Sequence, residues 1–237
     1  MGISRFYFVT DTASGNVVTS HTVLQPVADF IQKDKRDYRQ HEGLFFETLP
    51  ALGTIMGAFI HRTRRGQAAG GLRFWSYPTM EAYLRDGLRL AEGMTLKNAL
   101  AGLWWGGGKG VMTHNPGTDK HDPQIREKVY SAYGNFATSL RGCYVTAEDV
   151  GTSVKDMQDV FRTTRYTTCI PASIGGSGNP SVPTAKGVVA GMEAALDFLD
   201  VGTLAGKTIA VQGTGHVGSP LIRFLFEKGV ERVVASD

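Results

Sequence analysis

The chain has little of what marks secreted or metal-binding proteins. Among its 237 residues there are only two cysteines, Cys143 and Cys169, and neither belongs to a C-x-x-C pair. This excludes a disulfide framework and makes a cysteine metal site or redox motif unexpected. We therefore expect no metal ion, and a reducing, cytoplasmic location.

Charge and hydropathy exclude two further classes of protein. The formal net charge is only +3, which gives no reason to expect nucleic acid as a partner. No apolar run approaches the ~18 residues that a membrane-spanning helix needs. The N-terminus also lacks the basic and apolar regions of a signal peptide. The composition predicts a globular protein without a membrane partner.

Glycine is abundant instead. The 30 glycines cluster at 70–71, 106–110, 175–178 and 213–218. Such clusters favour tight turns at which the backbone approaches a ligand.

The hydrophobic spacing predicts an α/β chain. The predicted strands are 5–10, 55–62, 143–147, 207–212 and 232–236, with a weaker candidate at 44–46. A helix is expected from Thr79, and a second one with Thr95 as its N-cap, ending before the glycines. Further helices are expected after Asp122 and after Ser153.

A segment rich in proline and glycine, 170–183, is the best candidate for an interdomain hinge. After it, Thr184 is expected to cap a helix. The apolar side of that helix would comprise Val188, Met192, Ala195 and Leu199. The spacing then predicts a strand, a helix over 215–228 and a second strand.

Two lysines stand in settings where lysine is a poor structural choice. If Thr95 is an N-cap, Lys97 lies in the first helical turn, where the backbone dipole disfavours a cation. Lys109 follows three glycines in an apolar neighbourhood, where desolvation would lower its pKa. Such a pair suits the binding and chemistry of a small carboxylate. The alternative is two solvated lysines near a flexible turn.

The sequence Gly213-Thr214-Gly215-His216-Val217-Gly218 is a G-x-G-x-x-G motif between a predicted strand and helix. Asp237 lies nineteen residues beyond Gly218, at the end of the next predicted strand. This order is typical of a dinucleotide site, in which the helix N-terminus receives the pyrophosphate. Asp237 would bind the adenosine ribose and favour NAD over NADP. The alternative is a turn whose glycines serve packing only.

Five motifs in this order closely resemble the glutamate/leucine/phenylalanine/valine dehydrogenase family. The branch acting on apolar amino acids, leucine dehydrogenase in particular, is most similar. The motifs are Gly70–Arg73, the segment from Met94 to Gly110, Tyr144–Gly151, the segment from Gly178 to Val188, and the G-x-G-x-x-G sequence. The resemblance covers about 70 to 237, and residues 1–69 match only loosely.

The resemblance implies an N-terminal α/β substrate-binding and oligomerisation domain at 1–169. It implies the first β-α-β part of a Rossmann domain at 170–237. The implied activity is reversible, NAD-dependent oxidative deamination of an L-amino acid to its 2-oxo acid and ammonia. The substrate would be branched-chain or otherwise apolar, and the protein would be a homo-oligomer.

The resemblance also implies residue roles. Lys109 would activate the attacking water, and Asp149 would exchange a proton with the substrate amine. Lys97 would bind the substrate carboxylate, and Thr184 the nicotinamide carboxamide. The remaining substrate-binding residues would be Ala69, Gly70, Gly71, Met94 and Ala147. The remaining cofactor-binding residues would be Gly213, Gly215, His216, Val217, Gly218 and Asp237.

The resemblance ends at Asp237, two strands into a domain that normally continues. We therefore expect a C-terminally truncated member of the family, and the alternatives are a gene-model or splice truncation, an incomplete piece of a longer chain, or a genuinely short paralogue. This keeps an alternative open, a non-catalytic paralogue or isoform that acts as an oligomerisation module. Which amino acid the chain would bind is not predicted.

Overall fold

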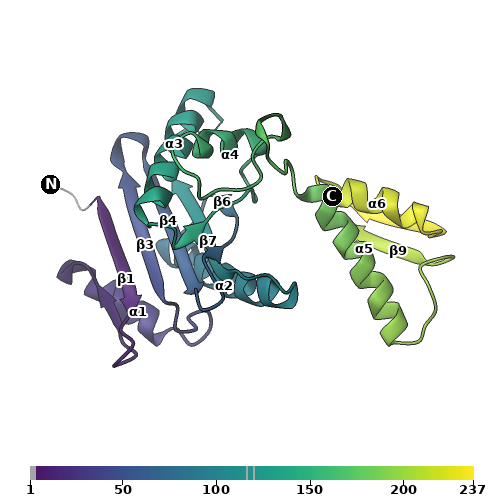
Figure 1. Ribbon diagram of the computed structural model, residues 1–237, viewed down its shortest axis with the longest axis horizontal. Coiled ribbons are helices and arrows are strands. Elements are labelled where there is room, and N and C mark those ends of the chain that lie inside the picture. Colours follow the sequence, from purple (N-terminus) through teal and green to yellow (C-terminus); the bar gives the residue numbers. More distant parts are fainter. Residues whose placement is uncertain (1–3, 116, 120) are drawn as a thin grey trace. The chain divides into compact units, whose positions relative to one another are not determined.

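The computed structural model describes residues 4–115, 117–119 and 121–237, and the chain divides into two compact units between Gly178 and Asn179 (Figure 1). This division lies inside the segment 170–183, which is rich in proline and glycine. Among the described residues, no helix is long and apolar enough to cross a membrane.

The first unit is built on a mixed sheet in the order β2-β1-β3-β4-β7-β5-β8, with β6 also pairing with β7. Pairing is antiparallel from β2 to β7 and parallel among β5, β6, β7 and β8. The strands are β1 (Arg5–Thr10), β2 (Val17–Thr19), β3 (Gly43–Leu49), β4 (Thr54–Arg62), β5 (Ala68–Ala69), β6 (Leu72–Phe74), β7 (Gly106–His114) and β8 (Tyr144–Val145).

Helices cover both faces of this sheet. They are α1 (Gln25–Lys33), α2 (Met80–Leu100), α3 (Pro123–Ser139) and α4 (Val154–Phe161), with 3-10 turns at Thr22–Leu24, Pro50–Leu52 and Ala172–Ile174. Alternate residues of β4 point to opposite faces, as a strand requires. Met56 and Ile60 join the core under α3 and α4, whereas Phe59 joins the core under α1 and α2. The predicted strands at 5–10 and 55–62 are confirmed.

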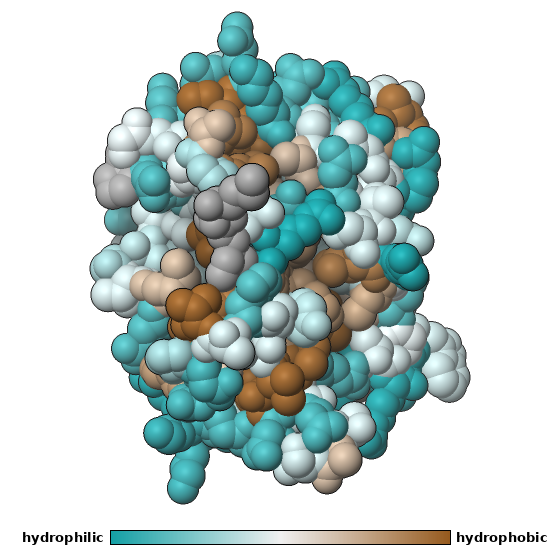
Figure 2. All heavy atoms as spheres, turned by 90° about the vertical axis from the view of Figure 1, so that its left-hand side faces the viewer, coloured by the Kyte–Doolittle hydropathy of each residue, from teal (hydrophilic) through white to brown (hydrophobic). Residues whose placement is uncertain are grey.

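The sheet ends at the short strand β2, which has only three residues. A short edge strand offers few free backbone groups to another chain. Figure 2 shows the face at the β1 and α1 end, where apolar patches are separated by hydrophilic side chains. The apolar groups that hold the fold together lie inside, on the two faces of the sheet.

The glycines at 106–110 lie in the first half of β7 rather than in a turn, so the expectation of a tight turn is wrong here. The reason is close packing on both faces of the strand. A Cβ at Gly107 would overlap the side chain of Thr95 on α2, and one at Gly110 would overlap the hydroxyl of Tyr133 on α3. Only glycine lets both helices come this near to the strand.

A single helix, α2, replaces the two helices predicted between 79 and 105. Thr79 is its N-cap and accepts a hydrogen bond from the Ala82 amide at 3.1 Å. Thr95 does not cap a helix, because it lies inside α2 and donates to the Ala91 carbonyl at 3.4 Å. Lys97 therefore lies in the last helical turn, where the dipole favours a cation. The expectation that Lys97 opposes the dipole is wrong.

Two other predicted helix starts are confirmed. The Asp122 side chain accepts from the Gln124 amide at 2.7 Å at the start of α3. Ser153 and Asp156 form a reciprocal capping box at the start of α4. Between them lies β8, which delivers the segment around Asp149 to the end of the sheet.

The second unit contains α5 (Ser181–Phe198), β9 (Thr208–Gln212), α6 (Gly218–Glu227) and β10 (Arg232–Ser236). The strands pair in parallel, as the predicted β-α-β order requires. Their small core contains Val189, Leu204, Val211, Leu225 and Val230. The start of a Rossmann-type domain after an α/β domain is thereby confirmed.

Three details of the second unit differ from the prediction. Thr184 is not the cap of α5, because the helix begins at Ser181 and the Thr184 hydroxyl donates to the Pro180 carbonyl at 2.8 Å. The buried face of α5 is set by Ala185 and Val189, whereas the predicted Val188, Ala195 and Leu199 are exposed. Helix α6 begins at Gly218 rather than 215, which places Pro220 within its first turn.

Candidate active site

A buried ion pair joins Lys109 and Asp149, which lie 40 residues apart in the chain. Lys109 lies on β7 with only 4% of its surface exposed, and its Nζ is 2.8 Å from Oδ2 of Asp149. Asp149 follows β8, and its amide donates to the Thr152 hydroxyl at 2.9 Å. That hydroxyl lies 3.1 Å from the Leu72 carbonyl on β6, to which it can donate. The loop that carries Asp149 is thus held against the sheet.

Burial and charge act on this pair in opposite directions. Burial lowers the pKa of Lys109, and the attraction of Asp149 offsets this only in part. Burial alone would raise the pKa of Asp149, but Lys109 and Arg73 outweigh it and hold that pKa below its usual value. The predicted desolvation of Lys109 is therefore present. Such a pair of groups with oppositely acting environments can hold and release protons.

Arg73 is part of the site although the sequence analysis assigned it no role. Its Nε donates to Asp149 Oδ2 at 3.1 Å, and its Nη1 donates to Asp86 Oδ2 at 2.8 Å. Asp86 also accepts from the Tyr77 hydroxyl at 2.7 Å. Arg73 belongs to the Gly70–Arg73 motif, which was the only available signal. Asp86 comes from α2, and no local spacing could have paired it with Arg73.

The two glycines before Arg73 lie against the same site. A Cβ at Gly70 would overlap the Gly108 carbonyl oxygen and would lie 3.1 Å from Met94 Cγ. A Cβ at Gly71 would lie 2.7 Å from the Cβ of Asp149. The structure thus brings Gly70, Gly71 and Met94 close to the ion pair. Side chains larger than hydrogen would displace it.

The two alanines in the prediction lie at neighbouring sheet positions. Ala69 on β5 is buried and pairs with Gly107 and Val145. Ala147 is half-buried and packs against the core, and its carbonyl accepts from the Leu72 amide at 2.7 Å. Both are therefore near the strand ends that carry the glycines.

Lys97 differs from Lys109 in its surroundings. It is exposed at the end of α2, and across the described residues its ammonium group makes no ion pair. The adjacent Asn98 is buried and donates to the Gly106 carbonyl at 2.6 Å. This bond ties the end of α2 to the start of β7, so the backbone that carries Lys97 is fixed while its side chain is free.

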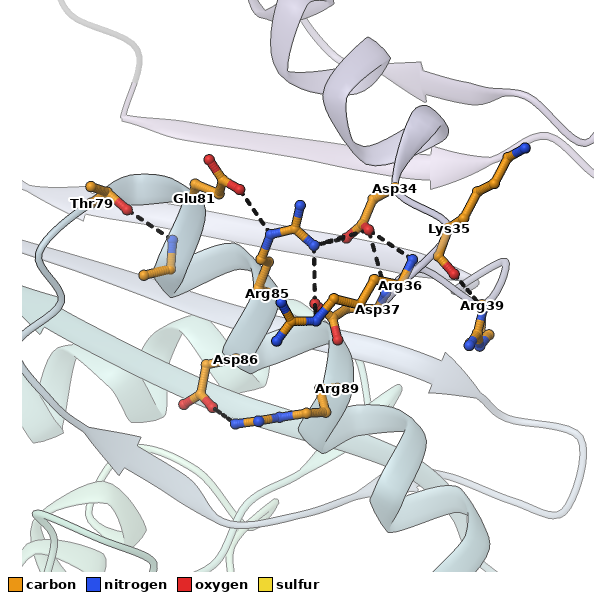
Figure 3. A network of polar contacts seen from close by, with 11 residues as sticks. Asp34, Lys35, Arg36, Asp37, Arg39, Thr79, Glu81, Arg85, Asp86 and Arg89 are labelled. Atoms are coloured by element: carbon orange, nitrogen blue, oxygen red, sulfur yellow. Dashed lines mark hydrogen bonds and ion pairs between the residues drawn. The ribbon is translucent and has the colours of Figure 1, made fainter.

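An open cavity of about 500 Å³ lies on the α2 side of Arg73, and its lining includes Arg73, Trp75 and Arg89. Figure 3 shows the neighbouring network, in which Arg85 reaches Asp34 and Asp37 and Arg89 reaches Asp86. The arginines there are matched by carboxylates. No group of three or more potential metal ligands occurs within the described ranges.

The G-x-G-x-x-G segment lies between β9 and the start of α6 of the second unit. Gly213 has a φ of +90°, and a Cβ at Gly218 would overlap the Gly213 carbonyl oxygen. Both positions therefore require glycine. The Thr214 hydroxyl donates to Asp237 Oδ2 at 2.8 Å, and the Thr214 amide donates to Oδ1 at 3.3 Å. These bonds lower the pKa of Asp237 and fix its carboxylate beside the loop.

The other predicted cofactor residues lie where the motif puts them. His216 is exposed and Val217 half-buried, just before the first turn of α6, and Gly215 is exposed. Thr184 lies on α5, near its N-terminal end. The amides at the start of α6 are those that a phosphate would approach.

Comparison with known proteins agrees with this picture. Residues 54–166 match the family described as "Glu/Leu/Phe/Val dehydrogenase, dimerisation domain", and residues 175–237 match "Glutamate/Leucine/Phenylalanine/Valine dehydrogenase". The leucine dehydrogenase of Bacillus subtilis is 48% identical over 206 residues, which are 86% of this chain and 54% of that protein. The valine dehydrogenase of Streptomyces virginiae is 45% identical over 177 residues, 74% of this chain and 48% of that protein.

Among solved structures, the L-tryptophan dehydrogenase of Nostoc punctiforme has a TM-score of 0.61 and 34% sequence identity. That match covers 83% of this chain and 54% of the other. The chain spans about half the length of each of these relatives. Together the two family matches extend over most of both units, and they include the ion pair and the glycine loop. The chain belongs to the Glu/Leu/Phe/Val dehydrogenase family.

Proposed function

We propose that the protein catalyses NAD-dependent oxidative deamination of an L-amino acid to its 2-oxo acid and ammonia. The observation that carries this proposal is the buried Lys109–Asp149 pair at 2.8 Å, with the pKa of Lys109 lowered by burial. A lysine whose pKa lies below its usual value gives up its proton more readily, as a base for the attack of water on an imine must. Relatives named leucine, valine and tryptophan dehydrogenase support this reaction class.

Each of the two groups has a separate task in the proposed reaction. Asp149 takes a proton from the substrate ammonium, so that the nitrogen lone pair can form the C=N bond. Lys109 takes a proton from the water that attacks the imino carbon. Asp149 then returns its proton to the nitrogen, and ammonia leaves as the C–N bond breaks and the C=O bond forms, with the hydroxyl proton passing to the departing ammonia. NAD, when bound, accepts the hydride from the substrate carbon. Because Lys109 is buried, its proton does not exchange freely with bulk solvent.

The substrate contacts follow from the residues around the pair. The exposed ammonium of Lys97 is available to bind the substrate carboxylate. Gly70 and Gly71 shape the pocket with their backbone, since neither position has room for a side chain. Met94 and Ala147 are half-buried and offer apolar surface without charge, and the buried Ala69 brings no polar side chain. This favours a branched-chain or other apolar amino acid.

The second unit is proposed to bind NAD. The glycine loop, with Gly213, Gly215, His216, Val217 and Gly218, would hold the pyrophosphate at the start of α6. Asp237 would accept hydrogen bonds from the adenosine ribose, and its negative charge would repel a 2′-phosphate. Thr184 would bind the nicotinamide carboxamide. The fit of these residues rests on the close approach at Gly218 and the fixed carboxylate of Asp237.

We also propose that the first unit carries subunit contacts, which the description "dimerisation domain" of the family matched at 54–166 supports. Assembly as a homo-oligomer without turnover is the alternative function. Native mass and NADH formation, measured on the same sample, distinguish the two.

The test of this proposal is the variant Lys109→Ala of this protein. We expect NADH formation from branched-chain L-amino acids and NAD to fall by roughly 10²–10⁴-fold, because the proton acceptor is lost. The affinity for NAD should stay the same, since Lys109 lies in the other unit. The matched control is Lys155→Ala, which removes an exposed lysine with 75% of its side chain accessible. Normal turnover in Lys109→Ala would refute the assignment.

A further inference from the structure

A row of alternating charges runs away from Lys109 on one side of the ion pair. Lys109 binds Asp149, Asp149 binds Arg73, and Arg73 binds Asp86, with distances of 2.8, 3.1 and 2.8 Å. Asp86 Oδ1 then binds Arg89 at 2.7 Å. The groups come from four places in the fold, namely β7, the segment after β8, β6 and α2. Tertiary structure alone brings them together.

Both cations that face Asp149 bind the same carboxylate oxygen. Lys109 Nζ and Arg73 Nε each contact Oδ2. In the described part of the chain no hydrogen bond is donated to Oδ1, and a quarter of the Asp149 side chain is exposed. Oδ2 is therefore held by two cations, whereas Oδ1 receives no hydrogen bond from the described residues.

Arg73 is itself held on both sides. Its neighbours on β6, Leu72 and Phe74, are buried, so the backbone is fixed. Its guanidinium is fixed by Asp86, which is 11% exposed and is bound in turn by Tyr77 and Arg89. Asp86 and Arg89 lie one turn apart on α2 (Figure 3). A planar guanidinium with two fixed carboxylates has little freedom to turn.

We propose that Arg73 is a positioning residue, which clamps Oδ2 of Asp149 together with Lys109 so that Oδ1 is the oxygen that exchanges the substrate proton. Asp86 holds Arg73 in this position. The inference rests on the proposed function and adds to it the oxygen that reacts and the residues that aim it. Groups that orient a reacting side chain in this way commonly matter nearly as much as the reacting group.

Removing Arg73 and removing the charge of Asp86 have opposite electrostatic effects on Lys109. Lys109 is faced by the charged groups Asp149, Arg73 and Asp86, and the Tyr144 hydroxyl lies in the same core below them. The positive charge of Arg73 lowers the pKa of Lys109, whereas the negative charge of Asp86 raises it. A general loosening of the site would admit water and move the pKa the same way in both variants.

The experiment is a pH titration by NMR of the whole chain, labelled with ¹³C at the lysine Cε and aspartate Cγ positions. It needs neither substrate nor NAD, so its result does not depend on turnover. The variants are Arg73→Gln, Arg73→Lys and Asp86→Asn. The matched control is Arg126→Gln, which breaks a similarly buried pair, Arg126–Asp156 at 2.6 Å, between α3 and α4.

We expect Arg73→Gln to raise the pKa of both Lys109 and Asp149. Asp86→Asn should lower the pKa of Lys109. Arg73→Lys should shift the pKa of Lys109 less than Arg73→Gln does, because lysine keeps the positive charge. Lysine has a single nitrogen, however, and cannot bind both carboxylates as the guanidinium does. Arg126→Gln should leave both groups unchanged.

The inference would be overturned if the pKa of Lys109 moved in the same direction in Arg73→Gln and Asp86→Asn, or if it moved in neither variant. So would an equal shift in the Arg126→Gln control. If the expected shifts occur but the unchanged protein forms no NADH, the clamp stands and the proposed function fails. The two hypotheses can therefore fail separately.

Discussion

At the scale of single residues, burial and charge decide what the ion pair can do. Lys109 has lost almost all contact with water, which lowers its pKa. The attraction of its partner Asp149 raises that pKa again, but only in part. The motif around Lys109 predicted this desolvation, because glycines and tryptophans surround it in the sequence. The direct ion pair with Asp149 and the second cation, Arg73, could not be predicted from spacing.

The acid stability of the protein should depend on Asp149. Its pKa in the folded state lies below the usual value of 3.8, so between these two pKa values the unfolded state binds more protons. The stabilisation is present above the usual value and is lost as the pH falls through the folded pKa. We expect Asp149→Asn to lower the free energy of unfolding at pH 7 by roughly 2 kcal/mol. The difference from the unchanged protein should shrink below about pH 4.

Urea unfolding between pH 7 and pH 3 measures this effect. The control is Asp29→Asn, which removes an exposed carboxylate of α1 that accepts a hydrogen bond from Gln25. A difference between Asp149→Asn and the unchanged protein that is the same at all pH values would contradict the argument. A large effect in the control would mean that net charge, rather than the ion pair, sets the acid limit.

At the scale of elements, close packing explains why glycine is concentrated where it is. Gly70 and Gly107 lie where backbone or a helix comes too near for a Cβ. Gly93, in the middle of α2, has open space around the position of a Cβ and therefore serves no packing purpose. The same residue type thus has opposite consequences at two positions of one unit.

This contrast makes a matched pair of substitutions. We expect Gly70→Ala to lower the free energy of unfolding by about 3 kcal/mol, because the overlap is with the Gly108 backbone, which cannot turn aside. Gly93→Ala should raise it by about 1 kcal/mol through helix propensity. Chemical unfolding of both variants measures the difference. If both substitutions changed the free energy of unfolding equally, the Gly108 backbone would not lie too close to Gly70 for a Cβ.

The element that ends the chain supports a prediction on cofactor choice. Asp237 follows β10, and its carboxylate is fixed beside the glycine loop by Thr214. We expect Asp237→Ala to reduce the preference for NAD over NADP by about tenfold, because repulsion of a 2′-phosphate is removed. Calorimetric titration with each dinucleotide measures this. Asp197→Ala removes an exposed carboxylate of α5 and is the control; unchanged discrimination in Asp237→Ala would argue against the assigned role.

At the scale of the whole molecule, each of the two units has its own apolar core. The first unit has cores on both faces of its sheet, and the second has a single small one around Leu225. We expect Leu225→Ala to destabilise the second unit by roughly 2–5 kcal/mol, since this side chain is fully buried. Hydrogen exchange should become faster at the amides of β9 and β10. The amides of β4 and β7 should keep their protection.

Ile60→Val on β4 is the complementary variant, because it removes one methyl group from the first unit's core. It should speed exchange in β4 and β7 by an amount corresponding to about 1 kcal/mol, and leave β9 and β10 unchanged. Equal acceleration in both units by either variant would show that they unfold as one.

The sequence by itself determined the α/β class, the starts of α2, α3 and α4, and the family. Local signals are enough for these features. Asp122 and Ser153 cap helices through bonds to residues two or three positions away, and the glycine loop is recognised by its own spacing. The prediction was wrong where a local signal was ambiguous. Thr95 has the residue type of an N-cap, but packing against β7 carries α2 straight through it.

Tertiary structure alone decided how the site is assembled. The glycines at 106–110 resemble a turn in sequence, yet antiparallel pairing with β4 makes them a strand. Lys109, Asp149, Arg73 and Asp86 come from four elements, and their pKa values depend on distances that no spacing encodes. The reason is physical. Helix caps and turns are set by bonds between near neighbours, whereas burial and charge pairing are set by whatever the fold brings alongside.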